Sequence, residues 1–330
     1  MNDRQLRRTR GTDRAARRAR VGLTVAAGLV AVYVFLQSPP LWFVTLRPCQ
    51  IPGDDPSEER VLVVAPHPDD DILGVGSSIA EFRSQGIPVL VVFLTSGDAN
   101  VAGQRLVTMN PFLFAADFRA IGGRRQKEAV VALGRLGVES ANAIFLNYPD
   151  RGLTALLETH WSSDVPYRSP YTDRSAKYSS VALHPGTPYS GEALLGDLED
   201  ILRAFRPTIV YLPHPLDAHE DHRAGYTFVR HAVGDLATSD PDFVSPAMRC
   251  YLVHSYAGLW PTPSRAADVL TMQPLEGFLG LGTWHSTPLT ENVIQAKYRA
   301  LRAHASQWWT SGGFLGSFVC SNELYMVEDS

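Results

Sequence analysis

Short apolar runs alternate with longer amphipathic stretches from residue 61 onward. The apolar runs are rich in β-branched residues and occupy residues 61–65, 89–95, 143–148, 208–214 and 249–255. Between them, residues 77–86, 124–137 and 192–206 place apolar residues at helical spacing with charged residues opposite. This alternation of strand and helix predicts parallel β-α-β units. We therefore expect an α/β fold with a Rossmann-like, mostly parallel sheet and helices on both faces.

One stretch breaks this rhythm. Residues 159–190 follow neither the helical nor the strand period. They predict a long loop, and loops of that length in a compact domain tend to be functional or mobile.

The N-terminus has a different pattern, in which a basic head precedes an uncharged apolar run. The first twenty residues carry eight arginines and two aspartates, and residues 21–36 carry no charge. With the following residues to 46, this run is long enough to cross a bilayer. It is longer than the apolar region of a cleaved signal peptide. We expect a transmembrane anchor at residues 21–46; the alternative is a buried core helix.

The anchor sets the expected organisation of the chain. Residues 1–20 would be a cytoplasmic tail, residues 47–60 a linker, and residues 61–330 the functional domain. Because arginines precede the span, the positive-inside rule places the N-terminus in the cytoplasm and the domain outside it. The expectation is a single-pass protein of the cell membrane. The excess of arginine over lysine is typical of a GC-rich bacterial genome.

Charge and cysteine content exclude two kinds of site. The net charge is −4, so the chain beyond the basic head carries about −10. Such a surface is a poor match to phosphate backbones, and we expect no nucleic-acid partner. Cys49, Cys250 and Cys320 contain no Cys-x-x-Cys pair, which argues against a thiolate zinc site. In an oxidising compartment two of them could pair, and the sequence does not say which two.

Two clusters of histidine and aspartate follow two of the predicted strands. His67 and Asp69 to Asp71 come after the first strand, and His219, Asp221 and His222 come after the fourth. Ligands bind at the carboxyl ends of parallel strands, so both clusters should meet at one edge of the sheet. Imidazole and carboxylate groups suit zinc, whose catalytic sites keep one position open for water.

The two clusters can share the work of a metal hydrolase in more than one way. One of Asp69 and Asp70 could ligate the ion while the other accepts a proton from water. His219 and His222 could both ligate, or one could stabilise an oxyanion, and Asp221 could orient a histidine. Taken singly, the aspartates could instead cap a helix, the two histidines could lie on a solvated turn, and His214 is typical of a strand end. The conjunction of the two clusters favours a metal site.

At this point the chain resembles a known family, the PIG-L/LmbE-like N-acetylglucosamine deacetylases. APHPDDD resembles the family's His-Pro-Asp-Asp-Glu signature, and HEDHRAG resembles its His-Pro-Asp-His motif. The resemblance extends to TSGD, RRQKEAVVALGRLGV, LNYPDRGL and KYRALRAHASQ, and it covers roughly residues 58 to 325. The chain departs from the pattern at Asp71, where the family usually has Glu, and at Glu220, where it usually has Pro.

The resemblance implies specific roles for eight residues. His67, Asp70 and His222 would hold the zinc, and Asp69 would be the general base. His219 would act as the acid or the oxyanion stabiliser, held by Asp221. Arg125 and Asp150 match positions that contact the sugar.

The implied activity is removal of an N-acetyl group from an acetamido sugar. Two alternatives stay open: an amidase that cuts a larger acyl group from an amino sugar, and a catalytically silent glycan-binding protein. The same ligand types would also suit iron or cobalt.

Overall fold

The sheet at the centre of the fold has seven strands in the order β3-β2-β1-β4-β5-β7-β6. The computed structural model describes residues 41–52, 59–108, 110, 112–256, 260–261, 270–280 and 282–328. The strands are β1 (Val61–Ala65), β2 (Val89–Thr95), β3 (Ala143–Tyr148), β4 (Ile209–Pro213), β5 (Ala247–Tyr251), β6 (Thr283–Pro288) and β7 (Asn322–Val327). Strands β1 to β5 pair in parallel, whereas β7 pairs antiparallel with both β5 and β6.

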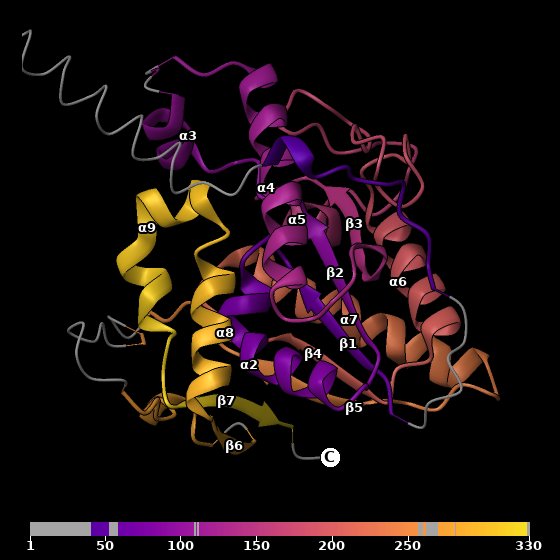
Figure 1. Cartoon of the computed structure of the whole chain (residues 1–330). Helices are drawn as coiled ribbons and strands as arrows, with labels where there is room; N and C mark the ends of the chain where they lie inside the picture. The colour runs from indigo at the N-terminus through magenta and orange to yellow at the C-terminus, as the bar shows by residue number, and fades with distance from the viewer. Residues whose placement is uncertain are drawn as a thin grey trace, which may run out of the picture. The chain divides into compact units, whose positions relative to one another are not determined.

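Helices cover both faces of this sheet, as Figure 1 shows. The α-helices are α2 (Asp70–Ser84), α3 (Val101–Thr108), α4 (Ala115–Gly134), α5 (Leu153–Glu158), α6 (Gly191–Phe205), α7 (Glu220–Ser239), α8 (Glu291–Leu301) and α9 (Ala305–Ser317). Short 3-10 turns form at η1 (Leu41–Phe43), η2 (Ser140–Asn142) and η3 (Glu276–Phe278). The predicted mostly parallel α/β sheet is therefore present.

The alternation of side chains along β1 explains the two layers of core. Leu62 and Val64 pack in the cluster built with α5, α6 and α7. Val61 and Val63 pack on the other face, with α2, α4, α8 and α9. Because successive strand residues point to opposite faces, a strand that is apolar throughout must be covered on both sides. The uninterrupted apolar run VLVVA therefore predicts that both faces of the sheet are covered at this strand.

The fold-class prediction was wrong about the N-terminal transmembrane helix. Residues 1–40, which hold most of the predicted span at 21–46, lie outside the described residues. Within the described part of the chain, no helix has the length and apolar character needed to cross a bilayer. Residues 41–46 of the predicted span are described, and they form only the turn η1 and irregular chain. The single-pass, extracytoplasmic localisation depended on this anchor and falls with it.

Other segments follow or refine the expectations. Residues 159–190 form the predicted long loop, held by a buried ion pair between Lys177 and Asp197 of α6.

The three cysteines are free thiols. Cys49 lies in the predicted linker, where its sulfur accepts a hydrogen bond from the backbone N–H of Phe145 at 3.2 Å. This part of the linker therefore packs against the edge strand β3.

Candidate metal centre

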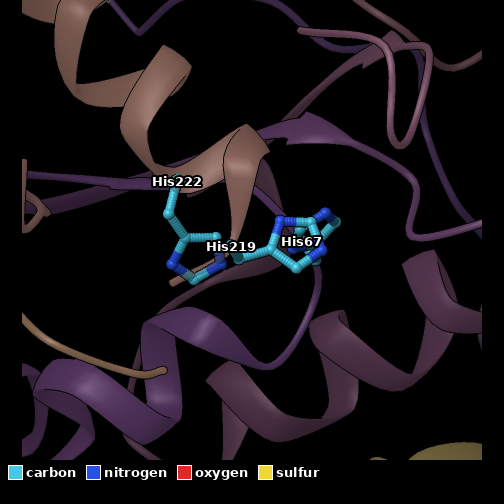
Figure 2. A group of neighbouring side chains, drawn as sticks. All are labelled: His67, His219 and His222. Atoms are coloured by element: carbon cyan, nitrogen blue, oxygen red, sulfur yellow. The ribbon is translucent and has the colours of Figure 1, made fainter. Parts of the chain in front are cut away.

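Two neighbouring strands deliver the two predicted clusters to one place. Strands β1 and β4 are adjacent and parallel, so the segment after β1 meets the start of α7, which follows β4. Figure 2 shows the side chains of His67, His219 and His222 gathered there. The ring of His67 lies 4.7 Å from that of His219 and 5.4 Å from that of His222, centroid to centroid. The expected convergence of the two segments is thus observed.

One carboxylate oxygen of Asp70 lies between nitrogen atoms of two histidines, at distances typical of neighbouring metal ligands. The Oδ2 atom of Asp70 lies 3.0 Å from Nδ1 of His67 and 3.1 Å from Nε2 of His222. In a tetrahedral zinc site with bonds of about 2.0–2.1 Å, donor atoms lie about 3.3 Å apart. His222 is fully buried, and neither ring nitrogen makes a hydrogen bond of acceptable geometry. A buried imidazole without a hydrogen bond fits a metal ligand.

Carboxylates behind the histidines fix which ring nitrogen faces the centre. Nε2 of His67 lies 3.3 Å from both Asp150 and Asp221. Nδ1 of His222 lies 3.2 Å from Asp217. Metal-ligating histidines usually give their second N–H to such a partner. Burial alone would lower the pKa of His222, but Asp70 and Asp217 outweigh it and raise the pKa to about 10. The cluster therefore stabilises positive charge.

Asp69 has a backbone and an environment unlike those of a simple helix cap. It is the N-cap residue of α2, yet its side chain makes no capping hydrogen bond, and its φ of 129° is strained for a residue with a Cβ. Its Oδ1 accepts a hydrogen bond from Arg125 at 3.0 Å. Burial, partly offset by Arg125, raises the pKa of Asp69 to about 7. The capping alternative is not supported at this residue.

Arg125 is a buried residue that positions Asp69. Besides Asp69, its guanidinium donates to the carbonyl oxygens of Gly97 at 2.7 Å and Pro68 at 2.6 Å. Gly97 has a φ of +61°, and a Cβ there would lie 1.9 Å from the guanidinium. The glycine of the TSGD segment is therefore needed for this close approach.

Asp221 contacts a different histidine from the one that the family resemblance implies. Its carboxylate lies beside His67 and accepts the backbone N–H groups of Arg151 at 2.6 Å and Leu153 at 3.1 Å. Toward His219 it offers only its backbone N–H, which donates to Nδ1 at 3.2 Å. Because Nδ1 accepts, the proton of neutral His219 is on Nε2. Burial and then the neighbouring His67 and His222 hold the pKa of His219 well below its ordinary value.

These groups open into a pocket of about 670 Å³. Its lining includes the predicted residues His67, Asp69, Asp70, Arg125, Asp150 and His219. Asp150 also accepts the backbone N–H of Ala99 at 2.7 Å, which ties β3 to the segment after β2. Tyr171 of the long loop lines another part of the wall, and Phe314 brings in α9.

Two residues of the site were missed by the sequence analysis. Asp217 lies two residues before His219, just ahead of the HEDHRAG segment, and His254 lies near the end of the predicted fifth strand at residues 249–255. The rule that ligands gather at the carboxyl ends of parallel strands could have pointed to both. His214, expected to be a strand-end residue, is buried and stacks on Trp284 with ring centroids 5.6 Å apart.

Comparison of the sequence with known proteins identifies a family and several relatives. A family profile described as GlcNAc-PI de-N-acetylase, PIG-L, matches residues 62–233. A 1D-myo-inositol 2-acetamido-2-deoxy-alpha-D-glucopyranoside deacetylase of Nocardia farcinica is 29% identical over 75% of this chain and 80% of its own length. A protein of the same name from Streptomyces griseus is 26% identical, over 80% of this chain and 79% of its own.

Solved structures agree on the fold. The A40926 pseudoaglycone deacetylase has a TM-score of 0.53 at 18% identity, covering 82% of this chain and 97% of that one. The N,N'-diacetylchitobiose deacetylase of Pyrococcus horikoshii has a TM-score of 0.50 at 20% identity, covering 82% and 83%. The family profile and the curated relatives confirm the predicted family and the predicted enzyme class, a deacetylase of acetamido sugars. With more than half of its length matched by the family profile, the chain belongs to the PIG-L family of de-N-acetylases.

Proposed function

We propose that this protein is a zinc-dependent hydrolase that removes the N-acetyl group from an N-acetylglucosamine-type sugar or glycoconjugate. The observation that carries the proposal is the position of Asp70 Oδ2, 3.0 Å from His67 and 3.1 Å from His222, with Asp69 beside it in the same pocket. His67, Asp70 and His222 would hold the ion. Zinc bound there supplies a Lewis acid that lowers the pKa of a water and polarises the acetyl carbonyl.

The side chains around the ion then divide the proton transfers. Asp69, oriented by Arg125, takes a proton from the attacking water. His219 donates its Nε2–H to the oxyanion as the tetrahedral carbon forms, because its Nδ1 is already an acceptor. The amide C–N bond breaks as the proton held by Asp69 passes to the nitrogen, which becomes the amine, and the acetyl group leaves with the oxygen of the water as acetic acid, which ionises to acetate. Arg125 and Asp150 line the same pocket and would contact the sugar.

The catalytic domain in this proposal spans residues 61–330 and so extends past the matched family segment. The support is that α9, which begins at Ala305, supplies Gln307, Ser311, Phe314 and Leu315 to the pocket wall. The Nocardia farcinica and Streptomyces griseus relatives are named as deacetylases of a 2-acetamido-2-deoxyglucoside of inositol, which makes that acetamido glucoside the first substrate to test. Since the pocket holds about 670 Å³, longer acyl groups should be compared with acetyl in the same assay.

The test is the substitution Asp69→Asn. We expect acetate release from the acetamido glucoside to fall about 10²- to 10⁴-fold, the usual contribution of a general base. Zinc content should stay at the wild-type level, because Asp69 is not among the proposed ligands. Asp242→Asn, the same change at an exposed aspartate, serves as the control. Retained activity in the Asp69 variant would reject the mechanism, and glycan binding without turnover by the wild type would favour the silent alternative.

A further inference from the structure

Asp217 connects the segment after β4 to the segment after β5. Its Oδ2 accepts the backbone N–H groups of Val253 at 3.0 Å and His254 at 2.9 Å, and its Oδ1 accepts that of His219 at 2.9 Å. The residue is fully buried. Because three backbone N–H groups donate to its two oxygens, the side chain of Asp217 acts as a hydrogen-bond acceptor.

This carboxylate determines the tautomer of His254. Nδ1 of His254 lies 3.2 Å from Oδ1 of Asp217. Since a carboxylate cannot donate, Nδ1 carries the proton, and in the neutral ring Nε2 is left as an acceptor. None of the described residues hydrogen-bonds this Nε2. The side chain of His254 is 34% exposed and lines the pocket, where it stacks on Phe314 with ring centroids 5.7 Å apart.

His219 and His254 thus form one wall of the pocket with opposite hydrogen-bonding character. Their ring centroids lie 5.4 Å apart. His219 presents an N–H donor, because its Nδ1 accepts from Asp221. His254 presents an acceptor, because its Nδ1 donates to Asp217. An acetamido sugar has the complementary pattern, with a carbonyl oxygen that accepts and an adjacent N–H or O–H that donates.

We propose that His254, held by Asp217, is a further substrate-contacting residue whose Nε2 accepts a hydrogen bond from the N–H or O–H next to the acetyl group. This inference rests on the proposed function, because it assumes an acetamido sugar in the pocket. It assigns His254 no role as a metal ligand and no proton transfer. Its contribution is to recognise the sugar and to fix the acetyl group relative to His219.

A second metal ion is the competing explanation for this cluster. Ligand atoms of Asp217, His222 and His254 lie within 4.8 Å of one another. However, Asp217 already accepts three backbone N–H groups, and Nδ1 of His222 and Nδ1 of His254 each lie 3.2 Å from one of its oxygens, within hydrogen-bond range. The contacts therefore favour hydrogen bonding over ligation. Zinc stoichiometry of the His254 variants distinguishes the two explanations.

Three substitutions separate the two ring nitrogens of His254. Asn can replace Nδ1 as a donor to Asp217 but does not reach the pocket. Gln reaches the position of Nε2 and presents an acceptor there. We expect kcat/KM for the acetamido glucoside to fall about ten- to a hundredfold in His254→Ala and His254→Asn. The fall should come mainly through KM, because the hydrogen bond from the sugar to Nε2 is lost. His254→Gln should recover to within about fivefold of wild type. His231→Ala, at an exposed histidine of α7, is the matched control.

The measurements distinguish failure of this inference from failure of the proposed function. Zinc content should remain the same in all His254 variants. Calorimetry in the Asp69→Asn background should show sugar binding weakened about tenfold by His254→Ala. Equal binding with and without His254, loss of zinc in the Ala variant, or an Asn variant as active as the Gln variant would each overturn the inference. Absence of acetate release from the wild type would instead overturn the proposed function, and the binding comparison would still decide the role of His254.

Discussion

Helix α2 contacts two buried clusters of charge, and only one of them is complete within the protein. Near its middle, Glu323 of β7 accepts hydrogen bonds from Ser77 N at 2.7 Å, Ser78 N at 2.8 Å and Ser78 Oγ at 2.8 Å. Lys297 of α8 donates to the same carboxylate at 2.7 Å and to the carbonyl oxygen of Leu73 at 3.0 Å. Every charged atom of this pair has protein partners.

These contacts also explain a break in the helix. Val75 has φ −140° and ψ 22°, which are not helical values. In a regular helix the N–H of Ser77 would donate to the carbonyl oxygen of Leu73. Here Glu323 takes the N–H and Lys297 takes the carbonyl, so the two side chains replace the helical hydrogen bond. The charges of this cluster serve the packing of α2 against α8 and β7.

The cluster at the start of α2 is arranged differently. Asp70 lies between two imidazoles, and His222 is buried without a hydrogen bond of acceptable geometry at either ring nitrogen. Leaving buried polar atoms in that state is costly unless a ligand completes them. The comparison teaches that burial of charge alone does not identify a functional site. Incomplete pairing, together with access to a pocket, does.

The largest expected effect comes from breaking the Lys297–Glu323 cluster, in which every charged atom has a partner. Lys297→Met should lower the free energy of unfolding by about 3–5 kcal/mol, because it leaves the carboxylate of Glu323 buried without its counter-charge. Urea denaturation measures the change. Zinc affinity should not change, since the residue does not contact the metal centre. Adding Glu323→Gln should recover part of the loss by removing the uncompensated charge. A Lys297 variant as stable as wild type would show that the pair does not hold α2.

Metal removal should destabilise the protein by an amount comparable to that of Lys297→Met, and it should act only through the cluster at the start of α2. Free zinc at about a thousand times Kd stabilises the folded state by about 4 kcal/mol, so a chelator should lower the melting temperature of the wild type. The Lys297→Met variant should show the same zinc-dependent shift from its lower starting point. His222→Ala should show little of that shift, because one of three proposed ligands is gone. Thermal unfolding with and without zinc tests this, and an unchanged shift in the His222 variant would argue against the ligand set.

The sequence predicted the buried strands of the fold better than the contacts within the site. The strands at 61–65 and 89–95 match β1 and β2, because strands buried on both faces must be apolar throughout. Strands β6 and β7 were not predicted. Strand β6 lies at the sheet edge and is largely exposed, so its residues TWHSTP have no apolar pattern.

Within the site, residues close in sequence were predictable and their partners were not. His67 and His222 were expected to converge because parallel strands end at one edge, and they do so. Asp221 was expected beside His219, its neighbour on the same helix turn, but its carboxylate reaches His67 across the sheet edge. Which histidine a carboxylate faces depends on how α7 packs against the end of β1. One sequence does not contain that information.

The smallest predicted effect tests whether Asp217 supports the proposed metal ligand His222. In Asp217→Asn one carboxylate oxygen becomes an amide NH₂, which cannot accept the backbone N–H groups now bound there. If the NH₂ replaces Oδ2, Nδ1 of His222 also loses the negatively charged oxygen that lies 3.2 Å away. Loss of such an outer partner costs about 10- to 100-fold in metal affinity. Competition with a chelator measures it, with Asp242→Asn as the control. Wild-type affinity would mean that Asp70 alone orients His222, whereas weakened affinity with preserved unfolding free energy would assign Asp217 to the incomplete cluster rather than to the framework.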